Sequence, residues 1–456
     1  MDLVLYNTMT RSKAPFVPLY ADNIRMYVCG PTVYDFAHVG NGRAVVAFDL
    51  LYRVLRHIYP SVTYARNITD IDDKIIKASS ETGEPVSDLT RRITDQFHAD
   101  MNALGALTPD EEPRATAYIA PMIDMTLVLI EKGHAYEADG HVLFHVPSMA
   151  NYGRLSRRNR DEMIAGARVE VAAYKKNPAD FVLWKPSREG EPAWDSPWGS
   201  GRPGWHLECS AMTGKLFGPV FDIHGGGLDL IFPHHENEIA QSCCAFGTDT
   251  MANWWVHNGY VTVEGEKMSK SLGNLITVHD MLDEAPGEAI RYLLLSAHYR
   301  QPLDFTRHGV YDAKKALDRF YTALAGASGV TAADVGVDEA VLAALLDDMN
   351  TPVAFAALHD LATRLNKTED AAEKADLKGR LLASAHLLGF CDSDPRSWFQ
   401  GAGLDDESVE IETMIEARNA ARKAKDFARA DAVRDELKSR GIVLEDGADG
   451  TGWKRA

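Results

Sequence analysis

The sequence has no long apolar run. Its 456 residues include no uninterrupted stretch of the roughly 18 apolar residues that a membrane-crossing helix needs. The first six residues, Met1 to Tyr6, lack both the basic region and the apolar core of a secretory signal. We therefore expect a protein without a membrane segment that is located in the cytoplasm.

Cysteine is also scarce, and the five cysteines are scattered along the chain: Cys29, Cys209, Cys243, Cys244 and Cys391. A small, odd and dispersed set argues against a disulfide framework and favours reduced thiols or metal ligands. We expect the adjacent pair, Cys243 and Cys244, to be ordinary thiols that face the core.

Positive charge is in short supply, because 48 Lys and Arg face 66 Asp and Glu, for a net charge of −18. Such a balance disfavours general electrostatic binding of nucleic acid. A local exception is the segment from Arg418 to Arg429, where five basic residues stand against Asp426 alone. On charge alone, this segment is more simply a solvated helix face.

Against these absences, the first informative feature is a strand-to-helix turn. Residues 24–28 and 62–68 have the pattern of buried strands, and residues 44–58 between them have helical spacing, which predicts the start of a parallel sheet. The connecting residues 29–43 begin with Cys29 and include His38 and Gly40. A helix N-terminus beside a glycine suits a phosphate, although a plain connection is an equally good interpretation of this turn alone.

The rest of the chain divides into regions of different texture. Residues 133–203 are rich in Gly, Pro and Trp and are predicted to be an insertion into the sheet domain, which resumes near residue 220. From about residue 306 we expect only helices, then a turn-rich stretch over 391–403 and a last module from about 405. The sequence predicts an α/β fold followed by a helical region and a small C-terminal module.

Four residues have the chemistry of a metal site. His234 and Glu238 share one face of a helix that we expect to open at Pro233. With Cys29 and Cys209 they would offer two thiolates, an imidazole and a carboxylate, which suit zinc. Spacing alone is weak support, since each cysteine could equally be a buried thiol. A zinc protease motif is excluded, because Ile239 stands where that motif needs histidine.

Two further groups could bind ligands. The string Lys267-Met268-Ser269-Lys270-Ser271 lies between two glycines and could place two cations on a triphosphate, or could be a solvated basic turn. Trp205 precedes Cys209 by four residues and is predicted to form a pocket wall near that thiol. Thr69 is expected at the carboxyl end of the second strand, close to the first turn.

Taken together, residues 38–41 and 267–271 resemble the two signature motifs of class I aminoacyl-tRNA synthetases. The longer strings sharpen the resemblance to the cysteinyl-tRNA synthetase family, and they cover nearly the whole chain: residues 27–35, 66–74, 204–210, 232–238 and 441–447. The resemblance implies a Rossmann-like catalytic domain over 1–305 with its insertion at 133–203, a helical bundle domain over 306–400 and an anticodon-recognition module over 401–456.

The resemblance also implies an activity. The chain would be a ligase that activates L-cysteine with ATP and Mg²⁺ and transfers it to cysteine tRNA, with one zinc ion per chain selecting the substrate thiolate. The implied zinc ligands are Cys29, Cys209, His234 and Glu238. The implied cysteine pocket is Thr69, Trp205 and His224. The implied ATP-binding residues are His38, Asn41, Lys267 and Lys270, of which His38, Lys267 and Lys270 would be catalytic.

Candidate tRNA contacts in the last module are Arg422, Phe427 and Asp431. One departure stands out, because the class motif usually ends in histidine and this chain has Asn41, which can donate a hydrogen bond but carries no charge. We expect the protein to be a monomer.

Three other functions compete. A cysteine:amino-sugar ligase of the mycothiol pathway is similar over the catalytic half, but such ligases lack the last module. A non-catalytic zinc and RNA-binding module would have no reason to keep His38, Lys267 and Lys270 together. A zinc hydrolase is disfavoured, because four protein ligands leave no obvious activated water.

Overall fold

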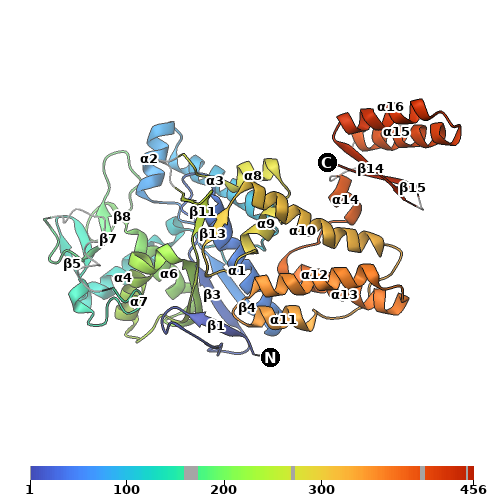
Figure 1. The fold of residues 1–456 in the computed structure, drawn as a ribbon. Helices are drawn as coiled ribbons and strands as arrows, with labels where there is room; N and C mark the ends of the chain where they lie inside the picture. The colour runs from blue at the N-terminus through green and yellow to red at the C-terminus, as the bar shows by residue number, and fades with distance from the viewer. Residues whose placement is uncertain (1, 159–172, 269–272, 401–405, 448–449, 456) are drawn as a thin grey trace. The chain divides into compact units, whose positions relative to one another are not determined.

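The computed structural model describes residues 2–158, 173–268, 273–400, 406–447 and 450–455. Its contacts divide the chain into two compact units. The first comprises Met1–Lys314, Glu339–Ala357 and Leu387–Gly389, and the second comprises Lys315–Asp338, Leu358–His386 and Phe390–Ala456. Figure 1 shows the elements of each unit.

A four-stranded parallel sheet forms the centre of the first unit, in the order β10-β9-β3-β4. Its strands are β3 (Ile24–Val28), β4 (Val62–Arg66), β9 (Phe221–Gly227) and β10 (Ala252–Asn258). The chain passes from β3 to β4 through helix α1 (Val39–Ile58), which is the crossover that a parallel pair requires. The predicted α/β fold class is confirmed.

Helix α1 begins five residues earlier than the predicted helix over 44–58. The His38 side chain accepts a hydrogen bond from the Asn41 backbone, and the Asn41 side chain accepts one from the His38 backbone. This reciprocal cap supplies partners for two backbone N–H groups that a helix start leaves unpaired. The prediction was wrong here, because Gly40, Asn41 and Gly42 are poor helix formers that hid the first turn.

Helices cover both faces of the sheet. In β9 the backbone of Gly225 faces the Phe48 ring of α1, whereas the neighbouring His224 points to the opposite face. On that face Tyr27 of β3, His224 and Trp255 of β10 lie in register. Helices α4 (Ile119–Glu131), α6 (Trp205–Phe217) and α7 (Glu236–Phe246) complete a buried core with them.

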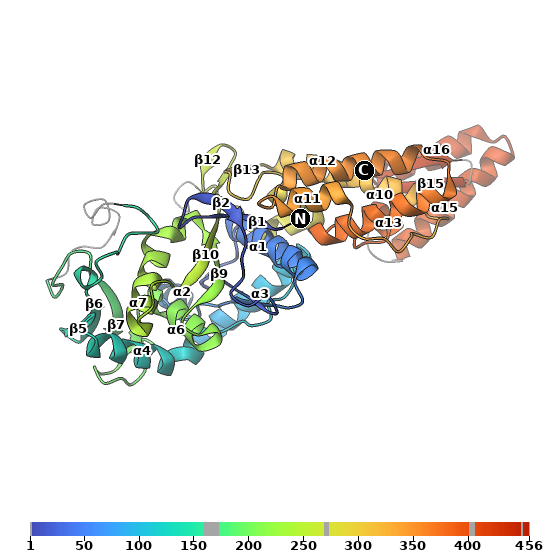
Figure 2. The ribbon, with the colours of Figure 1, turned by 90° about the horizontal axis from the view of Figure 1, so that it is seen from below.

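The region over 133–203 contains an antiparallel sheet of its own, in the order β5-β6-β7-β8. Its strands are β5 (Ala135–Ala138), β6 (His141–Phe144), β7 (Phe181–Pro186) and β8 (Gly201–Pro203). Figure 2 shows β5 to β7 on the far side of α6 and α7 from β9 and β10. Lys185 and Arg202 both bond to Asp73 at the start of α2 (Asp73–Thr82), which ties this sheet to a helix of the same unit.

Smaller elements surround the main sheet. A hairpin of β1 (Val4–Asn7) and β2 (Ser12–Pro15) precedes it. Strands β11 (Val261–Val263), β12 (Glu266–Lys267) and β13 (Leu303–Phe305) form a separate sheet. The remaining segments of the first unit are α3 (Val86–Ala103), α8 (Val278–Glu284), α9 (Gly287–Leu295) and the short turns η1 (Ala115–Tyr118), η2 (Val146–Ser148), η3 (Leu228–Leu230) and η4 (Ile231–His235).

The chain after residue 306 is helical up to its last module. The helices are α10 (Arg307–Gly326), α11 (Glu339–Leu346), α12 (Thr351–Lys367), α13 (Ala371–Leu388) and α14 (Pro395–Gln400). Helix α14 lies in the stretch over 391–403 that was predicted to be rich in turns, and no helix was predicted there. Asp394 accepts hydrogen bonds from the backbones of Arg396 and Ser397, and proline is favoured at a first helical position, so a short helix forms.

The last module has two helices, α15 (Asp406–Lys423) and α16 (Phe427–Ser439), and a hairpin of β14 (Ile442–Gly447) and β15 (Gly450–Arg455). It has its own small apolar cluster, built from Ile411, Ile415, Leu437, Ile442 and Trp453. Among the residues that the structure describes, no helix combines the length and apolar character needed to cross a membrane.

Candidate active site

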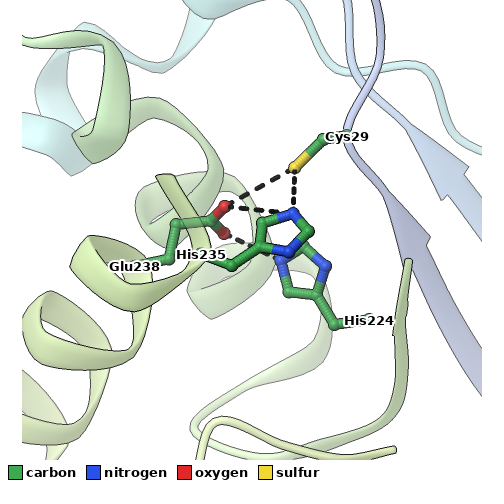
Figure 3. Close-up of side chains that lie close together, drawn as sticks. All are labelled: Cys29, His224, His235 and Glu238. Atoms are coloured by element: carbon green, nitrogen blue, oxygen red, sulfur yellow. Dashed lines mark hydrogen bonds and ion pairs between the residues drawn. The ribbon is translucent and has the colours of Figure 1, made fainter. Parts of the chain in front are cut away.

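Donor side chains converge at the carboxyl ends of β3 and β9. Cys29 directly follows β3, His224 lies in β9, and His235 and Glu238 come from η4 and α7. Figure 3 shows Cys29 pointing towards the His235 ring and the Glu238 carboxylate, with His224 close to the other oxygen of that carboxylate. Ligands of open parallel sheets bind at this edge.

The structure brings the four predicted metal-binding residues together. The ligand atoms of Cys29, Cys209, His234 and Glu238 all lie within 4.8 Å of one another. The two sulfur atoms are 3.7 Å apart, and Glu238 Oε1 lies 3.5 Å from Cys29 Sγ and 3.0 Å from His234 Nε2. Bonds of about 2.0–2.3 Å from a tetrahedral zinc place its ligand atoms about 3.3–3.8 Å apart. The donor set therefore fits zinc in both chemistry and size.

A second donor set shares two of these residues. Cys29, His224, His235 and Glu238 also lie within 4.8 Å of one another. His224 Nε2 is 2.8 Å from Glu238 Oε2, and His235 Nε2 is 3.4 Å from Cys29 Sγ. His235 was missed as a site residue, although the adjacent histidines 234 and 235 were the signal for it.

The helical run that leads into α7 opens at Pro233, as predicted. Residues 231–235 form the irregular turn η4, and the regular helix begins at Glu236. Within this turn only Phe232 has extended backbone angles, so the helical conformation starts after it. His234 and Glu238 face each other, as their spacing predicted.

The groups around the cluster stabilise the anionic forms of the Glu238 and Cys209 side chains. Burial pushes the pKa of Glu238 upwards, but the imidazoles of His224 and His234 outweigh it and hold that pKa well below the ordinary value. The hydrogen bond from Cys29, aided by His234, lowers the pKa of Cys209 to about 6. Burial and the neighbouring Cys209 raise the pKa of Cys29.

A shell of rings orients the cluster. Trp205 stacks on the His234 ring with centroids 4.2 Å apart, and it is 37% exposed, so it forms a wall and not core. His206 Nδ1 lies 2.9 Å from His234 Nδ1. On the side away from Cys29, the Nδ1 atom of His235 lies 2.8 Å from His257 Nε2. The Nδ1 atom of His257 in turn lies 2.8 Å from the Thr8 hydroxyl. Burial lowers the pKa of His257 to about 3 and that of His235 well below the ordinary value.

Thr69 lies beside this site but faces a carboxyl group that the sequence did not single out. Its hydroxyl donates to Glu208 Oε2 over 2.8 Å, and both side chains are buried. Burial raises the pKa of Glu208 well above the ordinary value. Asn67 accepts from the Gly30 backbone N–H over 2.8 Å, which fixes the turn that carries Cys29.

The predicted ATP motif lies at the N-terminus of α1. His38 and Asn41 form its cap, and a side chain on Gly40 would collide with the His38 ring and approach the methyl group of Met268. The backbones of Ala37 and Val39 also hydrogen-bond the segment 276–278. The backbone of Lys267 ends β12, whereas Lys270 lies outside the described residues.

The candidate tRNA contacts lie where α15 turns into α16. Phe427 is 63% exposed, Arg422 is exposed, and Asp431 forms an ion pair of 3.0 Å with Arg434. The basic face is smaller than the sequence suggested. Arg418 is 7% exposed and reaches Thr451, because it lies on the side of α15 that packs against the hairpin.

The structure as a whole and the sequence of residues 15–315 can each be compared with known proteins. Its structure is similar to that of Mycobacterium tuberculosis methionyl-tRNA synthetase in complex with methionyl-adenylate, with a TM-score of 0.56 and 16% identity over 80% of this chain and 89% of that one. It is also similar to the Agrobacterium radiobacter LeuRS in a ternary complex, with a TM-score of 0.57 and 12% identity over 83% of this chain and 87% of that one. Residues 15–315 match the family described as tRNA synthetases class I (C) catalytic domain. The molecule is therefore a class I aminoacyl-tRNA synthetase.

The particular family follows from the rest of the chain. Residues 340–392 match the DALR domain, and residues 404–453 match the cysteinyl-tRNA ligase anticodon binding domain. The chain is 64% identical to the cysteine–tRNA ligase of Rhodospirillum centenum and 60% identical to that of Rhodospirillum rubrum, each over the full length of both chains. It is 52% identical to that of Caulobacter vibrioides, over all of this chain and 99% of the relative. The chain belongs to the cysteine–tRNA ligase family.

Proposed function

We propose that this chain activates L-cysteine with ATP to form cysteinyl-adenylate and then transfers the cysteinyl group to the 3′ end of cysteine tRNA. The observation that carries the proposal is a buried set of two sulfurs, an imidazole and a carboxylate at the ligand-binding edge of the sheet, in a chain with full-length relatives named for this activity. The match of residues 404–453 to an anticodon-binding family favours tRNA over an amino sugar as acceptor.

Cys29, Cys209, His234 and Glu238 would hold a zinc ion, with ligand separations that suit its tetrahedral geometry. When bound, the zinc supplies a borderline-soft Lewis acid that favours a substrate thiolate over a hydroxyl. Direct ligation of sulfur discriminates more strongly between cysteine and serine than an apolar pocket can. Trp205, stacked on His234, and Thr69 would enclose the substrate side chain and its α-carbon.

Phosphate chemistry would take place at the N-terminus of α1. The cysteine carboxylate attacks the α-phosphorus of ATP, and pyrophosphate leaves with its Mg²⁺. His38, whose ring is oriented by its hydrogen bond with the Asn41 backbone, and the two lysines Lys267 and Lys270 would stabilise the charge that builds up on the phosphates. The terminal ribose hydroxyl of tRNA then attacks the carbonyl carbon of the adenylate, the bond from that carbon to the phosphate oxygen breaks, and AMP leaves as the hydroxyl loses its proton. Both steps are direct transfers, so no covalent enzyme intermediate forms.

Transfer-RNA charging with cysteine and with serine in parallel tests the proposal. We expect ATP-dependent charging of cysteine tRNA with cysteine. The kcat/KM for charging with serine should be at least about a thousandfold lower, because the serine hydroxyl is a poor partner for a buried zinc position that is suited to a thiolate. Adenylate formation without transfer to tRNA would instead favour the amino-sugar ligase. No cysteine-dependent pyrophosphate exchange in zinc-replete protein would refute the enzyme itself.

A cytoplasmic location and a monomeric state stay predictions. In the structure none of the five cysteines forms a disulfide bond, as expected in a reducing compartment. Sedimentation of the purified chain would test the monomer.

A further inference from the structure

A fully buried arginine lies in α1 just after the ATP motif. Arg43 follows His38 by five residues and Asn41 by two, and it is 1% exposed. Among the residues whose side chains the structure describes, no carboxylate forms an ion pair with it. Burial lowers the pKa of Arg43 to about 10. A buried cation without a counter-ion is costly unless other polar groups satisfy it, so its partners need an explanation.

Those partners are four backbone carbonyl oxygens from two separate segments. Nη1 donates to Tyr260 over 2.7 Å and to Gly259 over 3.2 Å. Nη2 donates to Gln301 over 2.6 Å and to His298 over 3.2 Å. One guanidinium therefore joins α1 to the segment before β11 and to the segment before β13.

The two segments are built to reach the same guanidinium. A side chain on Gly259 would lie 2.4 Å from the Gln301 carbonyl oxygen, so only glycine permits this approach. The Gly259 N–H donates to the Tyr299 carbonyl over 2.7 Å, and the Leu303 N–H donates to the Tyr260 carbonyl over 3.0 Å. The two segments are therefore hydrogen-bonded to each other, and Arg43 attaches both of them to α1.

These hydrogen-bonded segments lead into the small sheet that contains Lys267. Strand β11 begins at Val261, next to Tyr260, and it pairs with β13 on one side and β12 on the other. In that pairing Thr262 lies opposite Lys267. A displacement of Tyr260 therefore reaches the backbone of Lys267 through a few hydrogen-bonded residues.

We propose that Arg43 is a positioning residue, which sets the place of β11 and β12, and so of Lys267, relative to the α1 N-terminus that carries His38 and Asn41. The proposal rests on the proposed function, in which both groups act on ATP. Arg43 itself is only 1% exposed, so it acts through the segments that it bonds. A planar guanidinium with forked donors can bond two carbonyl pairs at once, which the single ammonium of lysine cannot do.

The test measures pyrophosphate exchange by Arg43→Lys and Gly259→Ala, which disturb the same junction from its two sides. We expect each variant to lower kcat/KM for ATP by about tenfold or more while the KM for cysteine changes less than twofold. Arg291→Lys is the matched control, because Arg291 is equally buried and bonds Asp49 of α1, but its carbonyl partners are Leu104 and Leu388. The control should lose thermal stability without a selective change in the ATP parameters.

A double-mutant cycle with Lys267→Ala separates positioning from general damage. If Arg43 acts through Lys267, the loss caused by Arg43→Lys should largely disappear when Lys267 is already alanine. Fully additive losses, or unchanged ATP parameters in Arg43→Lys, would overturn the proposal.

Amide hydrogen exchange keeps this test independent of activity. Residues 259–267 and 298–305 should exchange faster in Arg43→Lys than in the unsubstituted protein, and not in Arg291→Lys. If the unsubstituted protein shows no pyrophosphate exchange, the proposed function fails, and unchanged amide exchange would then separately refute the anchoring by Arg43.

Discussion

At the scale of single residues, the site contains more metal donors than one ion needs. Two sets share Cys29 and Glu238, and they differ in whether Cys209 with His234, or His224 with His235, completes the site. The first set includes two sulfurs, which a borderline-soft ion such as zinc prefers. Substitution of a residue that belongs to one set alone distinguishes them.

We predict that Cys209→Ser reduces bound zinc from about one per chain to a small fraction and lowers cysteine-dependent pyrophosphate exchange at least a hundredfold, since a serine hydroxyl is a poor zinc ligand. Metal analysis of the purified protein together with the exchange rate measures this. Cys243→Ser is the control, because Cys243 is equally buried in the same core but lies outside both sets. Full zinc occupancy in Cys209→Ser would point to the set with His224 and His235, and His235→Ala would then lose the metal.

The sequence predicted those site residues that lie within continuous motifs, and it missed those that only folding brings together. The strings around Cys29, Cys209 and His234 are continuous, so they carried the resemblance on which the zinc ligands were named. His257 and Thr8 were missed, because their contact joins residues 249 positions apart and each looks ordinary in its own segment. Glu208 was passed over for the same reason, since only folding brings Thr69 to it.

At the scale of elements, the site depends on close packing of β9 against α1. A side chain on Gly225 would lie 2.3 Å from the Phe48 ring, and the Gly225 carbonyl accepts from the Cys29 backbone N–H over 3.1 Å. The glycine thus lets strand and helix approach while its carbonyl holds the turn that presents a metal donor.

Gly225→Ala should therefore lower the free energy of unfolding by about 1–3 kcal/mol, or more if the ring cannot move, because overpacked cores shift backbone and side chains. Chemical denaturation gives the value. Gly329→Ala, where an added methyl meets nothing within 4 Å, should stay within about 0.5 kcal/mol of the unsubstituted protein. A neutral Gly225→Ala would contradict the packing described for β9.

Element types followed well from periodicity, and element ends did not. The strands predicted over 24–28 and 62–68 and the helix predicted over 44–58 are present as β3, β4 and α1. The start of α1 and the whole of α14 were missed, because each depends on caps made by side chains such as His38 and Asp394. Caps are local chemistry that hydrophobic periodicity does not register.

At the scale of the whole molecule, the last module matches an anticodon-binding family and has an apolar cluster of its own. Its apolar cluster lies within residues 411–453, and Trp453 at its centre donates from Nε1 to Glu412 over 2.9 Å. With a net charge of −18, the chain as a whole does not attract RNA phosphates, so a tRNA contact in this module would depend on exposed basic residues such as Arg422.

Trp453→Ala should reduce kcat/KM for tRNA charging by tenfold or more and leave pyrophosphate exchange within twofold, because it removes the centre of the cluster in the module but no residue of the catalytic unit. The two assays on one preparation measure this, and Trp453→Phe, which keeps most of the apolar volume, should be milder. Equal losses in both assays would show that the module also supports adenylate formation.

The hydrogen bonds that link His235, His257 and Thr8 determine which ring nitrogen of each histidine carries a hydrogen. Because burial keeps His235 and His257 neutral, each ring carries a single N–H, and the shared hydrogen bond allows only two tautomer arrangements. If Cys29, Cys209, His234 and Glu238 hold the proposed zinc, Cys29 is a thiolate that only accepts hydrogen bonds, so His235 would carry its hydrogen on Nε2. His257 would then donate from its own Nε2 to His235 Nδ1, and the Thr8 hydroxyl would donate to His257 Nδ1. A hydroxyl at the start of the chain thus completes the tautomeric order that begins at a metal ligand.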